Sequence, residues 1–158
     1  MKQYFILIVL LIAGCNLSAQ QNLPQVRPAD FKLTYHFDGG MSYHFEDIII
    51  SKDSCVYRLN ERGHIITRKF FISEAGLDSL YTILKQNRFT EIEYRNEGMV
   101  YDRGGKSIEV SWNNNKEWRK VSDAQSHFVK DGWKQQWLLI CRYVINLPYS
   151  SLVSKKQY

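Results

Sequence analysis

A segment near the start of the chain alternates strictly between apolar and polar residues, and this alternation constrains the fold more than any other feature. Residues 31–38 read Phe-Lys-Leu-Thr-Tyr-His-Phe-Asp, so every apolar side chain falls at an odd position. Successive side chains of a β-strand point to opposite faces, and the pattern therefore predicts a strand with one buried face. A single strand cannot cover that face, so the chain must build a sheet with a second layer against it.

The same pattern predicts a hairpin. An Asp-Gly-Gly turn signal follows the strand, and apolar residues then resume at odd positions. A three-residue loop over 39–41 would place Phe37 opposite Tyr43 and Tyr35 opposite Phe45, so that the two apolar faces coincide. A two-residue loop would set apolar against polar residues, and we therefore predict the three-residue loop.

Further strands are expected over residues 55–59 and 64–72, and on either side of a second turn. That second turn is an Asn-Asn-Asn sequence. If it has three residues, Val110 lies opposite Trp118 and Glu109 lies opposite Arg119. The second of these pairs would be a favourable cross-strand contact between opposite charges.

Two helices are predicted. Ser73 is a good N-cap for the first, which ends near Asn87, and its apolar face is formed by Leu77, Leu80, Tyr81 and Leu84. The second helix is expected to be capped by Ser122 or Asp123 and to end at Pro148. Its apolar face would contain Trp133, Trp137, Ile140, Cys141 and Val144.

This order of elements predicts an α+β fold, in which two helices pack on one face of an antiparallel sheet. The single domain would span residues 31–147, with a frayed tail over 148–158. Residues 15–30 are polar and read as a flexible tether. Aromatic residues make up 14% of the chain. Because all four Trp fall on predicted inward faces, we expect them to fill the core rather than to mark a ligand site.

The first 14 residues read as a secretory signal. Lys2 gives a positive start, and residues 5–13 form an apolar run that is too short to span a bilayer. Residues 12–15, Ile-Ala-Gly-Cys, resemble the lipobox of bacterial lipoproteins, in which the cysteine is lipidated. We therefore predict lipidation at Cys15, and the alternative is ordinary signal-peptidase cleavage after Ala19. Either route predicts an exported protein, in the cell envelope when anchored and periplasmic or secreted when released.

The charge of the chain argues against a nucleic-acid partner. The formal net charge is +5, but basic and acidic residues are interleaved, and the longest basic runs are pairs such as Arg68-Lys69. No basic stripe forms the electrostatic footprint that nucleic acid requires. The positive balance is more consistent with solubility, or with a position near an anionic surface.

Two His-Phe-acid triplets form the most chemically suggestive cluster. In the predicted hairpin His36 faces His44, and Asp38 and Glu46 lie near them. Imidazole and carboxylate groups are suitable ligands for Zn²⁺, so the four residues form a hypothetical metal site. A polar sheet face on which two histidines happen to be neighbours explains the same pattern, and we favour this second interpretation.

Cys55 and Cys141 both fall on predicted inward positions. A disulfide between them would suit an exported protein. Two buried free thiols are the other interpretation, and the one that we favour, because cysteine is a common core residue. Residues 102–105, Asp-Arg-Gly-Gly, read as a turn rather than as a catalytic loop.

The layout resembles small exported bacterial lipoprotein-like domains of unknown function. The similarity covers residues 31–147 and lies in the order of the elements, in the Ser-Glu-Ala-Gly-Leu helix start at 73–77, and in two Gly-Gly motifs at 37–40 and 101–105. Such domains bring no catalytic residues to carry over. We expect a binding or interaction module without a cofactor or catalytic activity, attached to the membrane through a lipid anchor, whose partner is an unknown protein or glycan. The alternative is a metal-assisted hydrolase that uses the paired histidines.

Overall fold

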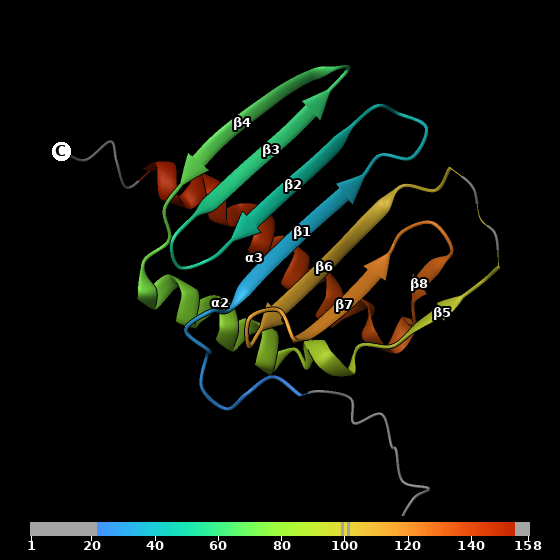
Figure 1. The fold of residues 1–158 in the computed structure, drawn as a ribbon. Helices are drawn as coiled ribbons and strands as arrows, with labels where there is room; N and C mark the ends of the chain where they lie inside the picture. Colours follow the sequence, from blue (N-terminus) through green and yellow to red (C-terminus); the bar gives the residue numbers. More distant parts are fainter. Residues whose placement is uncertain (1–21, 99, 101, 154–158) are drawn as a thin grey trace, which may run out of the picture.

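The computed structural model describes residues 22–98, 100 and 102–153. Six antiparallel strands form the main sheet in the order β4-β3-β2-β1-β6-β7, and β5 and β8 form a separate two-stranded sheet (Figure 1). The strands are β1 (Lys32–Asp38), β2 (Phe45–Ile50), β3 (Cys55–Glu61), β4 (His64–Phe70), β5 (Tyr94–Asn96), β6 (Gly105–Trp112), β7 (Glu117–Asp123) and β8 (His127–Val129). The helices are α2 (Glu74–Gln86) and α3 (Lys134–Val153), with short 3₁₀ turns η1 (Phe89–Glu91) and η2 (Asp131–Trp133). The predicted α+β class and the antiparallel sheet are confirmed.

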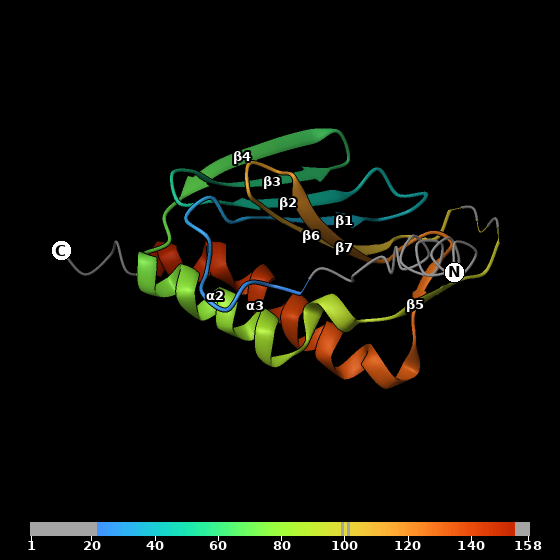
Figure 2. The same ribbon diagram turned by 60° about the horizontal axis from the view of Figure 1, so that its bottom comes forward.

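The two helices lie beside one another beneath the six-stranded sheet, as Figure 2 shows. The side chains of β1 alternate between two environments. Leu33 and Tyr35 are fully buried, whereas Lys32 and His36 are exposed. The strict alternation of the sequence is thus the alternation between a core face and an open face. Among the described residues, no helix is both long and apolar enough to cross a membrane.

The predicted register of the first hairpin is wrong. Tyr35 pairs with Ile48 rather than Phe45, and the connecting loop runs from residue 39 to residue 44. The loop closes through its own backbone, where the amide of Gly39 donates to the carbonyl of His44 at 2.8 Å. This register buries Ile48 and Ile50 completely. Because these isoleucines occupy even positions, they set the phase of β2 and leave the earlier odd-numbered aromatic residues outside the core.

The predicted register of the second hairpin is wrong as well, here by one residue. Val110 pairs with Arg119, and the turn has four residues, 113–116, rather than three. Asn113, Asn114 and Asn115 all adopt left-handed backbone conformations, with φ between 53° and 60°. Asparagine tolerates this region better than most residues, so three in succession make the longer turn accessible.

The first predicted helix is confirmed, whereas both predicted ends of the second are wrong. The Ser73 hydroxyl accepts a hydrogen bond from the Gly76 amide at 3.1 Å, and the predicted apolar face of α2 is buried. Ser122 and Asp123 belong to β7 instead of capping a helix, because the alternating pattern around Val121 continues the sheet. Helix α3 also passes through Pro148 instead of ending there.

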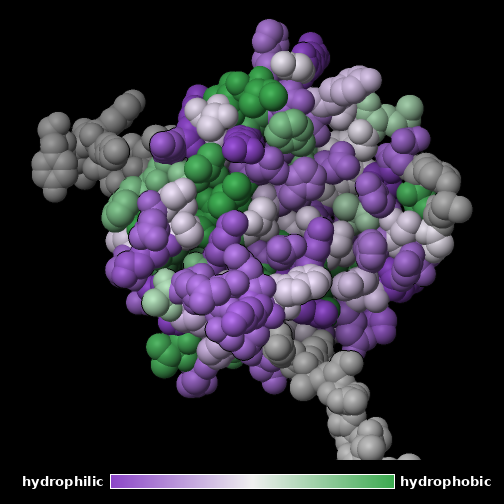
Figure 3. Space-filling view, in the orientation of Figure 1, coloured by the Kyte–Doolittle hydropathy of each residue, from purple (hydrophilic) through white to green (hydrophobic). Residues whose placement is uncertain are grey.

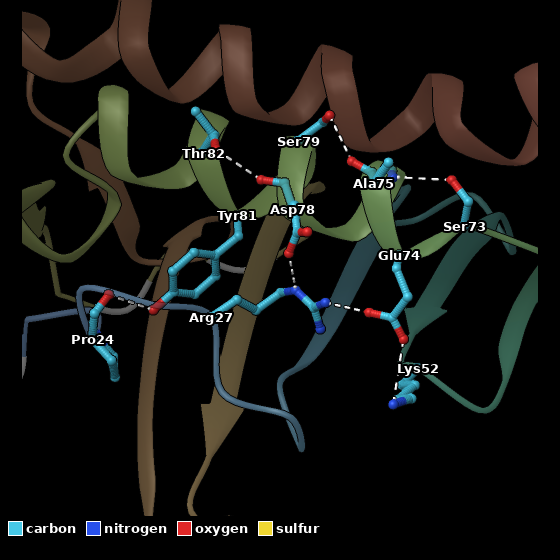
Figure 4. Close-up of polar contacts among 11 residues, drawn as sticks. Pro24, Arg27, Lys52, Ser73, Glu74, Ala75, Asp78, Ser79, Tyr81 and Thr82 are labelled. Carbon is cyan, nitrogen blue, oxygen red and sulfur yellow. Dashed lines mark hydrogen bonds and ion pairs between the residues drawn. The ribbon is translucent and has the colours of Figure 1, made fainter.

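Residues 22–31, which we call the N-terminal strap, lie along α2 (Figure 4). The Arg27 guanidinium contacts two carboxylates of this helix, Glu74 at 2.5 Å and Asp78 at 2.8 Å. The Tyr81 hydroxyl donates to the carbonyl of Pro24 at 2.8 Å, and its ring meets that of Phe31 edge-on. The described part of the predicted tether, residues 22–30, is therefore fixed to α2 at Arg27 and at Pro24.

Candidate functional site

The open face of the sheet carries a row of polar side chains that crosses four strands. The register places Asp47 of β2 beside His36 of β1, and His36 beside Ser107 of β6. Ser107 in turn pairs with Ser122 of β7. Strand alternation puts all four side chains on the face opposite the buried Tyr35.

His36 is oriented by a carboxylate. Its Nδ1 lies 2.6 Å from Oδ1 of Asp47, so the carboxylate accepts a hydrogen bond from that nitrogen. Within the described part of the chain, Nε2 of His36 has no hydrogen-bond partner. Its side chain is 46% exposed, so this second nitrogen is available to a ligand.

The structure does not bring the four residues of the hypothetical metal site together. His44 lies in the β1–β2 loop, where its ring meets Phe37 at 5.6 Å, so the predicted pairing of His36 with His44 is wrong. Glu46 shares the core face with Ile48, whereas the carboxylate of Asp38 accepts a hydrogen bond from the Gly40 amide at 2.9 Å. In the described ranges, no three His, Cys, Asp or Glu residues gather so that they could hold a metal ion.

The burial of Glu46 affects its protonation. Removal of the carboxyl from water raises its pKa, and this outweighs the opposite influences of Tyr57 and of the positive groups nearby. The strand alternation, which puts Glu46 on the face of buried Ile48, accounts for this burial.

Trp118 is an exposed aromatic residue on the open face. Its exposed fraction is 58%, compared with 3% for Trp112 and 1% for Trp137. The expectation that all four Trp are inward is wrong for Trp118, because the four-residue turn shifts β7 by one position. The outward position of Trp118 could have been predicted from Val121. If this apolar residue is buried, the odd positions of β7 face the core and the even positions face the open side.

Two hollows adjoin Trp118. The His36 hollow, of about 430 Å³, is lined by residues that include His36, Asp38, Ser107, Lys120, Ser122 and His127. The Thr34 hollow, of about 360 Å³, is lined by Lys32, Thr34, Glu109, Ser111 and Asn115. Trp118 lines both hollows, and we call the two together the Trp118 groove. In Figure 3 this face of the molecule is mostly hydrophilic, and its larger hydrophobic patches lie toward the upper left of the view.

Arg103 contacts the segment that connects β7 to β8 at the edge of the groove. Its guanidinium pairs with Asp123 at 2.8 Å, donates to the carbonyl of His127 at 2.9 Å, and lies 3.9 Å from the centre of the Phe128 ring. The neighbouring Gly105 is required by packing, because a Cβ there would come within 1.9 Å of the Asp123 carbonyl oxygen. Residues 103–105 thus position the β7–β8 turn that bounds the His36 hollow.

Cys55 and Cys141 are both buried and both free in the structure. Burial raises the pKa of the Cys141 thiol to about 12 and also raises that of Cys55. Neither thiol lines the Trp118 groove. Cys15 lies outside the described residues.

Comparison with known proteins adds no family. No family model matches the chain, and no curated protein is similar to it.

Proposed function

We propose that the protein is an exported, lipid-anchored binding module without catalytic activity, and that the Trp118 groove is its binding surface. The partner is a protein or a glycan of the cell envelope rather than nucleic acid. The observation that carries this proposal is the exposure of Trp118, at 58%, on the polar face of the sheet. Exposed Trp side chains offer a large apolar surface with a polar edge, which suits ligand contact.

In this proposal the two helices pack on one face of the sheet and leave the other to the partner. The alternation of β1 supports this division, because Leu33 and Tyr35 are buried while Lys32 and His36 are exposed. A sheet with one covered face presents its other face as a broad platform for a ligand.

The lipid anchor is proposed from the signal-like start of the sequence and from Ile12 to Cys15. Residues 15–21 join Cys15 to the N-terminal strap. Even a fully extended chain of that length reaches only about 25 Å. Because Arg27 and Tyr81 hold the strap on α2, the anchor would keep the domain close to the membrane.

Photo-crosslinking in the native envelope tests the binding surface. A benzophenone amino acid replaces the exposed Lys116, in the turn two residues before Trp118, and in a matched control it replaces the exposed Arg142 of α3. We expect a crosslinked product from position 116 that is lost on Trp118→Ala, and none of this kind from position 142. Equal capture at both positions would contradict the proposal.

Fractionation tests the anchor separately. We expect the Cys15→Ser variant to leave the membrane fraction and to lose incorporation of a labelled fatty acid. If processing and fractionation are unchanged, the anchor is wrong while the binding surface is still open to the crosslinking test.

A further inference from the structure

The two hollows of the Trp118 groove differ in charge, and this difference indicates what the groove binds. The Thr34 hollow holds one basic and one acidic residue, Lys32 and Glu109, beside neutral hydrogen-bonding side chains. Among these, the Ser111 hydroxyl donates to the side-chain oxygen of Asn115 at 2.8 Å. A hollow with balanced charge and many donors and acceptors suits a ligand that is rich in hydroxyl groups.

The His36 hollow has more basic than acidic side chains. Lys120, His36 and His127 line it, and Asp38 is the acidic residue among its lining residues. Arg119 adds no free charge, because its guanidinium donates to the carbonyl of the buried Ile92 at 3.1 Å. The Asp38 carboxylate is already engaged by the Gly40 amide. Within the described residues, the Lys120 ammonium forms no ion pair. The hollow therefore offers the Lys120 ammonium and imidazole N–H groups to an anionic group.

Trp118 lines both hollows, and Tyr94, which is 37% exposed, is a second aromatic side chain at the edge of the His36 hollow. The other side chains that line the groove are small or polar. A protein partner would need an apolar centre that excludes water, with several such side chains. A sugar ring needs one aromatic face for its C–H groups and many hydrogen-bonding groups around its edge. The composition of the groove matches the second requirement better than the first.

We propose that the Trp118 groove binds an acidic oligosaccharide. One sugar ring stacks on Trp118, neutral hydroxyl groups occupy the Thr34 hollow, and a uronic carboxylate lies in the His36 hollow beside Lys120. This inference rests on the proposed binding function and names the ligand class of the same surface.

Calorimetric titration of the full-chain protein with defined oligosaccharides tests the inference. The probes are tetrasaccharides of galacturonic and of mannuronic acid, each compared with its methyl ester, which keeps the sugar rings and hydroxyl groups but carries no charge. We expect at least one acid to bind, and its ester to bind about tenfold more weakly, because a charge-assisted hydrogen bond is lost.

Three variants locate the binding. Trp118→Ala should abolish binding of the acid. Lys120→Met should lower the affinity for the acid about tenfold and leave the affinity for the ester unchanged. Lys116→Met, which alters an exposed lysine outside both hollows, should change neither.

The inference is overturned if neither acid binds, if acid and ester bind equally, or if Trp118→Ala binds as well as the unmodified protein. A positive crosslink from position 116 together with no binding of either acid would overturn the ligand class alone. Failure of the crosslink as well would overturn the proposed function.

Discussion

The N-terminal strap and the Trp118 groove each combine a basic side chain with an aromatic one, but only the strap finds its partners within the chain. Arg27 of the strap is 10% exposed at its side chain and contacts two carboxylates of α2. Trp118 of the groove is 58% exposed, and Lys120 beside it forms no ion pair among the described residues. Satisfied groups of this kind hold a fold together, whereas unsatisfied ones are available to a ligand.

The largest expected effect comes from truncating one aromatic residue in each region. Phe31, where the strap meets β1, is 1% exposed, so Phe31→Ala should lower the free energy of unfolding by about 3–5 kcal/mol. Trp118→Ala should change it by less than about 0.5 kcal/mol, because an exposed side chain contributes little packing. Urea denaturation measures both values. Similar losses for the two variants would remove the distinction between the regions.

A second prediction concerns the charges of the strap. Hydrogen bonding from Arg27 lowers the pKa of Glu74 below its usual 4.5. A carboxyl whose pKa is lowered by folding adds stability that is present above its usual pKa and is lost as the pH falls. We therefore expect that the free energy of unfolding of Arg27→Met falls less steeply as the pH is lowered below about 4.5. We also expect residues 22–30 of this variant to be cleaved more readily by protease.

The matched control for the strap is Arg58→Met. Arg58 is an exposed cation of β3, with no ion pair in the described part of the chain. Its replacement should leave unchanged both the pH dependence of the free energy of unfolding at acid pH and the sensitivity to protease. If Arg58→Met and Arg27→Met behave alike, the strap is not held by its ion pairs.

The smallest effect is expected from Glu46, a carboxyl on the helix side of the sheet without an ion-pair partner among the described residues. Burial raises its pKa, so the folded protein binds this proton more readily than the unfolded chain does. Stability therefore falls as the pH rises through the interval between the usual value of 4.5 and the raised one. Glu46→Gln should remove this loss, as measured by denaturation at a series of pH values.

Glu109→Gln is the control for Glu46, because it removes one exposed carboxyl from the open face. The difference between the two variants isolates the effect of burial from that of net charge. If both variants shift the stability curve equally, the position of Glu46 on the covered face has no consequence for its titration.

The sequence predicted the elements whose patterns are local. The alternation over residues 31–38 identified the half-buried strand β1, and Ser73 with the spacing of Leu77 and Leu84 identified α2 and its buried face. These features depend on the intrinsic period of a strand or a helix, and each can be recognised within a few residues of the chain.

The candidate site could not be predicted in the same way. His36 was singled out with the wrong partner, and Trp118 was assigned to the core, because each depends on a hairpin register. A shift of one residue moves every side chain of a strand to the opposite face.

Local periodicity in the sequence by itself thus determined that the chain forms an antiparallel α+β domain with half-buried strands and an amphipathic helix. Only the tertiary structure decided which side chains meet on the open face. The left-handed turn at Asn113 to Asn115 and the burial of Ile48 and Ile50 set the two registers. Those registers place Asp47 beside His36 and turn Trp118 outward, because turn geometry and core packing are settled between strands rather than within them.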